Sequence, residues 1–151
     1  MELTLDEALQ KAVKAHKTGQ VQEADRLYKA ILKAQPKHPD ANHNMGVLAT
    51  GAGMVQESLP FFKTALEANP KIEQFWLSYV GALLKGNQFE SAKQVLEQGK
   101  KEGLVAGEEV NTLVERLTLI TQATKSTLPE QKKSLTLSEK HKKLVGQKKQ
   151  K

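Results

Sequence analysis

Residues 19–36 read GQVQEADRLYKAILKAQP, and residues 53–70 read GMVQESLPFFKTALEANP, so similar residues recur 34 positions apart. Corresponding positions hold a turn residue, a small residue, a large apolar residue and a closing proline. The matches are Gly19, Gly53 and Asn87; Ala24, Ser58 and Ala92; Tyr28, Phe62 and Leu96; Pro36 and Pro70. Three copies in one register, without an insertion, indicate an internal repeat.

Each copy predicts two helices joined by a tight turn. Before Gly19, apolar residues recur every three to four positions, and Thr4 with Glu7 forms a capping-box pattern. After Gly19 a second amphipathic stretch follows, which Pro36 and Pro39 prevent from continuing. The predicted helices span 5–18, 21–34, 39–51, 55–68, 73–85 and 89–102. The expected fold class is therefore all-α, with three antiparallel helix pairs.

The pattern changes in the last third of the chain. Residues 108–123 predict a seventh helix with one apolar face, which would cap the open end of a repeat array. Residues 125–129 are expected to form a linker, followed by a disordered lysine-rich tail. The alternatives are a short helix from Ser138 that docks on a neighbour, or the start of a linker to a further domain. The predicted division is a domain at 1–124 and a tail at 125–151.

The net charge of +6 at pH 7 comes from the tail. Residues 125–151 hold nine Lys and two Glu, a balance of +7, which leaves 14 basic and 15 acidic residues before them. Lysines without interleaved aromatics predict salt-sensitive attraction to acidic surfaces and no specific nucleic-acid binding. The absence of cysteine excludes disulfides, thiolate zinc sites and cysteine nucleophiles. With no signal peptide or membrane span in the sequence, we expect a cytoplasmic protein.

The 34-residue period and its pattern resemble the tetratricopeptide repeat family over residues 5–106, in repeats 5–38, 39–72 and 73–106. The matches are Trp76 at the Trp position, Met45 and Gly46 at the Leu-Gly pair, Ala24 and Ala92 at the small position, Tyr28 and Phe62 at the aromatic position, and Pro36 and Pro70 at the closing position. The departures are Ala8 in place of Trp, Val80 in place of Gly and Leu104 in place of Pro. The resemblance implies an α-α superhelix. Residues 38–46 are also similar to bacterial repeats found ahead of transferase domains.

In this family the first helix of each pair lines a concave groove that binds an extended peptide or a partner helix. The resemblance implies a groove formed by Leu9, Val13, His16, Lys17, His43, Asn44, Val47, Thr50, Leu77, Ser78, Gly81, Leu84 and Lys85. Gly81 would leave a hollow in its wall. The Asn44 carboxamide offers a donor and an acceptor to a peptide backbone, with a bond to a neighbouring helix as the alternative. Some family members hold a C-terminal carboxylate in a clamp of Lys, Asn and Arg side chains. Asn44 fits one clamp position, but Leu9, Val13, Gln74 and Ser78 stand at the others, so no carboxylate clamp is expected.

No catalytic constellation is found in the sequence. There is no glycine-rich phosphate loop after a strand, no nucleophile elbow and no HExxH motif, so we expect no enzyme activity, no cofactor and no metal. The one candidate metal or pH-sensing pair is His16 with His43, which would face each other across adjacent helices without a Cys, Asp or Glu to join them. Trp76 is expected in the core rather than against a ligand.

The expected function is therefore a non-catalytic interaction module that holds a protein or peptide partner in its groove. A homodimer is a further expectation, in which Leu135, Leu137, Leu144 and Val145 of the tail enter the groove of a second molecule. The alternatives are the N-terminal scaffolding part of a larger transferase-type enzyme, and nonspecific binding of acidic surfaces through the tail.

Overall fold

A computed structural model describes residues 2–136, with side chains through Lys125. Its helices are α1 (Leu5–Lys17), α2 (Val21–Ala34), α3 (Pro39–Gly51), α4 (Val55–Ala68), α5 (Glu73–Lys85), α6 (Phe89–Lys101) and α7 (Glu108–Thr136). The described residues contain no strand, and the fold is all-α as predicted. They divide into two compact units, one that ends at Asn111 and one that begins at Thr112.

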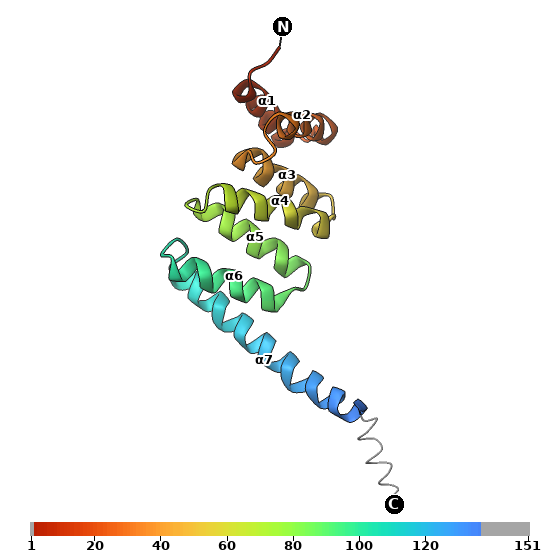
Figure 1. Cartoon of the computed structure of the whole chain (residues 1–151), viewed down its shortest axis with the longest axis vertical. Coiled ribbons are helices and arrows are strands. Elements are labelled where there is room, and N and C mark those ends of the chain that lie inside the picture. Colours follow the sequence, from red (N-terminus) through yellow and green to blue (C-terminus); the bar gives the residue numbers. More distant parts are fainter. Residues whose placement is uncertain (1, 137–151) are drawn as a thin grey trace, which may run out of the picture. The chain divides into compact units, whose positions relative to one another are not determined.

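In the first unit, α1 to α6 form three antiparallel pairs that follow one another along the chain (Figure 1). The first helices of the pairs also contact each other, since α1 packs on α3 and α3 on α5. The second helices, α2, α4 and α6, make no such contacts with one another in the described part of the chain. Because the first helices are spaced more closely than the second, they line the inner, concave side of this unit.

Short local signals explain where these helices begin and turn. Thr4 and Glu7 form the predicted capping box, with both nitrogen-to-oxygen distances at 3.1 Å. The turn inside each pair contains a residue with positive φ, namely Gly19 at 80°, Gly53 at 81° and Asn87 at 60°. Glycine adopts this conformation without steric cost, and asparagine tolerates it better than most residues. The recurrence of Gly, Gly and Asn at this repeat position therefore has a backbone cause.

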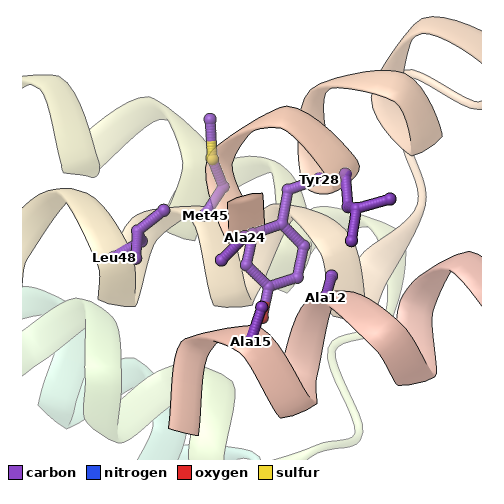
Figure 2. Packing of buried hydrophobic residues seen from close by; sticks show 7 residues of the cluster. Ala12, Ala15, Ala24, Tyr28, Met45 and Leu48 are labelled. Atoms are coloured by element: carbon purple, nitrogen blue, oxygen red, sulfur yellow. The ribbon is translucent and has the colours of Figure 1, made fainter. Parts of the chain in front are cut away.

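The core of the first two pairs is built around Tyr28, which is fully buried. Figure 2 shows its ring pointing toward Ala12 and Ala15 of α1, with Met45 of α3 in the same cluster. Small alanines let the helices approach closely around this large ring. The cluster is completed by Ala24, Leu27 and Leu48.

The Trp position of the repeat has a hydrogen-bonding role as well as a packing role. Trp76 is 5% exposed, as predicted, and its Nε1 donates to the Pro70 carbonyl at 2.9 Å. Asn42 stands 34 positions earlier, is 4% exposed, and its Nδ2 donates to the Pro36 carbonyl at 3.0 Å. At both positions a side-chain N–H satisfies the carbonyl of the proline that closes the preceding repeat.

The seventh helix is longer than the sequence predicted. We expected it to end near residue 123 and a linker to follow at 125–129, but α7 continues through this segment to Thr136. The linker interpretation gave too much weight to Pro129, because Glu, Gln and Lys just beyond it are good helix formers. The short helix proposed from Ser138 lies outside the described residues. The capping role and the domain boundary at 124 stay predictions. No described helix is long and apolar enough to cross a membrane.

Candidate partner-binding groove

The predicted groove residues lie on α1, α3 and α5, the helices of the concave side. Lys17, Val47 and Lys85 are exposed. The others are half-buried: Leu9, Val13, His16, His43, Asn44, Thr50, Leu77, Ser78, Gly81 and Leu84. None of the thirteen belongs to the fully buried core, so the structure leaves them at the surface of the inner side. We call this set the inner strip.

Polar groups of the inner strip are connected across α3 and α5. Gln74 Nε2 donates to Ser78 Oγ at 3.0 Å, and Ser78 Oγ lies 2.8 Å from Nε2 of His43. On the other side of the imidazole, His43 Nδ1 lies 3.3 Å from Oδ1 of Asn44. These hydrogen bonds join the second repeat to the third.

The connection continues to the first repeat through Tyr28. Burial raises the pKa of the Tyr28 hydroxyl above its ordinary value of 10.0, and the neighbouring Asn44 side chain acts against this shift. The Tyr28 Oη lies 3.4 Å from Nδ1 of His16, and the two rings meet edge to face at 6.1 Å between centroids. The alternative interpretation of Asn44, a bond to a neighbouring helix, stays a prediction, and so does the use of this amide by a partner.

The hydrogen-bond donors and acceptors between Gln74 and His16 can all be paired if each residue donates to the next. Gln74 donates to Ser78, Ser78 to His43, His43 to Asn44, Asn44 to Tyr28 and Tyr28 to His16. This arrangement requires a neutral His43 imidazole that carries its proton on Nδ1. Hydrogen bonds aligned in this way strengthen one another and hold the helices in register.

The surroundings of His43 favour its neutral form. Its ring stacks on Phe75, with centroids 4.9 Å apart and an angle of 24°, and lies 5.7 Å from the Phe62 ring. Burial lowers the pKa of the imidazole below its ordinary value of 6.5, although the Asn44 hydrogen bond and the charge of Asp40 act against this shift.

In the described part of the chain, no direct contact joins the predicted pair of His16 and His43. His16 packs on Tyr28 and His43 on Phe75. The use of the two imidazoles as a metal or pH-sensing pair stays a prediction. Among the described side chains no three His, Cys, Asp or Glu groups are placed to hold a metal ion.

An open hollow of about 500 Å3 lies along α1 at one end of the inner strip. It is lined by the predicted residues Leu9, Val13 and Lys17 and by three that the prediction omitted, Gln10, Lys14 and Thr18. The omitted residues follow one another at intervals of four and come directly after the predicted ones in the sequence. Helical periodicity alone could therefore have predicted that they share a face of the helix. Gln74 was likewise considered only as a clamp position.

Among the described side chains, the lysines of the inner strip have no acidic partner. The ion pairs among residues 2–125 are Arg26 with Glu23 at 2.7 Å and Lys29 with Asp25 at 3.0 Å, both on α2. Lys17 and Lys85, at the ends of α1 and α5, therefore present unpaired positive charge at one edge of the strip.

The sequence pattern described as the tetratricopeptide repeat matches residues 49–117. These residues are tetratricopeptide repeats. This confirms the family predicted from the 34-residue period, and the solenoid formed by α1 to α6 is the fold expected of these repeats. No curated relative matches the sequence.

Solved tetratricopeptide repeat structures share this fold at low sequence identity. The Sgt2 repeat domain of Aspergillus fumigatus is 18% identical with a TM-score of 0.68, covering 82% of this chain and 83% of that one. The Yersinia enterocolitica secretion chaperone SycD, in complex with a peptide of the translocator YopD, is 15% identical with a TM-score of 0.69, covering 80% and 97%. The first repeat domain of Spaghetti (RPAP3), bound to the HSP90 peptide SRMEEVD, is 17% identical with a TM-score of 0.63, covering 76% and 93%.

The lowered pKa of His43 predicts that acid destabilises this repeat domain. In the folded state the imidazole stays neutral below pH 6.5, whereas in the unfolded chain it takes up a proton there. Folding stability is therefore expected to fall as the pH drops through 6.5 toward the folded pKa. His43→Gln should show a smaller fall over the same interval, measured as urea midpoints at several pH values. Identical pH dependence in both proteins would contradict the role of His43.

Proposed function

We propose that this chain is a non-catalytic protein-interaction module that holds an extended peptide or a partner helix on its inner strip. The observation that carries the proposal is the exposure of apolar side chains on the concave side, outside the core. Val47 is 37% exposed. Val13 stands at the same repeat position on α1, Leu9 and Leu77 stand one turn earlier on α1 and α5, and all three are half-buried. Such a surface gains free energy when a partner removes it from water.

Two further observations support this proposal. The hydrogen bonds from Gln74 to Asn44 join the second and third repeats, so this part of the inner strip is preformed and a partner need not order it. In addition, the similar structures of SycD and RPAP3 were solved with peptides bound. We extend peptide binding to this chain on the basis of the shared fold, and we place the module in the cytoplasm, as its lack of cysteine suggests.

The experiment compares two exposed valines on different sides of the fold. Val47 of α3 lies on the inner strip, and Val21, 48% exposed, begins α2 on the opposite side of the pair. A phage-displayed library of random peptides is selected on the wild-type chain, on Val47→Glu and on Val21→Glu. The wild type and Val21→Glu should enrich the same peptides. Val47→Glu should weaken their binding by about tenfold or more, since it places a charge at the centre of the interface.

Circular dichroism of both variants controls for folding. Equal enrichment by all three proteins would mean that the inner strip is not the binding surface, and the absence of any enriched peptide would contradict peptide binding itself. Light scattering of the same samples reports the oligomeric state. The predicted homodimer requires a mass above that of one chain; Leu137, Leu144 and Val145, on which it partly depends, lie outside the described residues.

A further inference from the structure

Apart from Gly51 at the end of α3, three glycines lie in the interior of helices of the first unit, and two of these three are explained by packing. A Cβ at Gly46 would approach Phe62 to 2.7 Å, and one at Gly99 would approach Val105 to 2.8 Å. A Cβ at Gly81 would meet no atom within 4 Å. Because glycine is less favourable than alanine inside a helix, Gly81 has a stability cost without a compensating contact in the chain.

The space beside Gly81 opens onto the inner strip. The 2.8 Å contact between His43 and Ser78 holds α3 against α5. Val47 lies one turn beyond His43, and Gly81 one turn beyond Ser78, in the common direction of the two helices. The missing side chain at Gly81 therefore leaves open space on this face of α5, with Leu77 one turn before it.

A positive charge stands one turn beyond this gap. Lys85 is exposed and forms no ion pair among residues 2–125. Four residues of helix rise by about 6 Å. In an extended peptide, side chains two residues apart point the same way and are separated by about 6.6 Å. The spacing from Gly81 to Lys85 thus matches one side-chain repeat of an extended strand.

We infer that the partner is an extended acidic peptide, with an apolar side chain in the gap at Gly81 and a carboxylate two residues away on Lys85. This inference rests on the proposed function and adds the chemistry of the ligand to it. Charge complementarity selects the occupant, because Lys85 and Lys17 favour carboxylates. Residues 125–151, with nine Lys and two Glu, have the wrong charge to lie against Lys85.

The test repeats the peptide selection with variants of this position. The wild-type chain, Gly81→Ala, Gly81→Leu, Lys85→Glu and Val21→Glu are exposed to the same random library. The most enriched wild-type peptide is then synthesised with a fluorophore, and its affinity for each protein is measured by fluorescence anisotropy. Thermal melting shows whether each variant is folded. Gly81→Ala should melt higher than the wild type, since alanine is the better helix former and meets no clash.

The expected wild-type peptides carry an acidic residue two positions from an apolar one. Gly81→Leu fills the gap and should weaken binding by about tenfold, with Gly81→Ala weakened less. Lys85→Glu should bind the acidic peptides about tenfold more weakly and should enrich peptides with a basic residue at the same position. Val21→Glu should behave as the wild type. A Gly81→Ala protein that is more stable yet binds less tightly would separate the effect on binding from any loss of fold.

Two results would overturn the inference while leaving the proposed function intact. One is a set of peptides whose affinity depends on Val47 but is the same for the wild type, Gly81→Leu and Lys85→Glu. The other is a set of Val47-dependent peptides that are basic, which would point instead to a Lys-rich segment such as the tail of a second copy. If no peptide depends on Val47, the proposed function fails and the inference fails with it.

Discussion

Replacing Trp76 with Ala is expected to lower the free energy of unfolding by about 3–5 kcal/mol. The indole is 5% exposed and lies against Gly99 of α6, where a Cβ would come within 3.1 Å of its Cε3 atom. Its removal leaves a cavity between α5 and α6 and also leaves the Pro70 carbonyl without its 2.9 Å donor. Because each repeat is stabilised by its neighbours, this substitution should lower the stability of the whole first unit.

Urea unfolding followed by circular dichroism measures this change, since Trp76 is the single tryptophan and its fluorescence is lost with it. Trp76→Phe is the matched control. It keeps most of the ring but removes the N–H donor, and should cost about 1–3 kcal/mol, the usual penalty for an unsatisfied carbonyl. A loss below about 1 kcal/mol in Trp76→Ala would be incompatible with a buried indole at this position.

Gly46→Ala and Gly81→Ala are expected to change stability in opposite directions. Both place a methyl group inside a helix, so both gain about 0.5–1 kcal/mol of helix propensity. At Gly46 the new Cβ would lie 2.7 to 2.9 Å from three atoms of the Phe62 ring, which is itself 3% exposed and cannot move aside freely. Overpacking of this kind costs about 1–3 kcal/mol, so Gly46→Ala should be destabilised on balance.

Thermal and urea unfolding of the two variants, side by side, checks the prediction. The double variant Gly46→Ala with Phe62→Leu should recover part of the packing cost relative to Phe62→Leu alone, because a smaller side chain makes room for the methyl group. Equal shifts in the same direction at Gly46 and Gly81 would mean that α3 and α4 are not in close contact at Gly46.

The local elements of this protein could be predicted from the sequence because their signals lie within a few residues of each other. Thr4 with Glu7 marks a helix start, Gly19 and Gly53 mark turns, and Pro36 stops a helix. The 34-residue period then ordered these elements into repeats. Predicted core residues such as Ala24, Tyr28, Phe62 and Trp76 are buried, since periodicity shows which face of a helix turns inward.

The connections between repeats could not be predicted in this way. The chain of hydrogen bonds from Gln74 to His16 uses residues of α5, α3, α2 and α1, and whether their atoms come within reach depends on how the helices pack. The same is true of the ring contacts of the two histidines, since His16 packs on Tyr28 and His43 on Phe75. Asn42 occupies the Trp position of its repeat, but only the fold brings its amide to the Pro36 carbonyl.

By itself, the sequence determined the family, the all-α class and the bounds of α3, α4 and α5. These properties follow from backbone conformation and helical periodicity, which act over one or two turns. The tertiary structure decided the neutral state of His43, the need for glycine at 46 but not at 81, and the absence of a partner for Lys85 among the described side chains. Each of these depends on distances between atoms of separate helices, and those distances are set by side-chain packing rather than by local pattern.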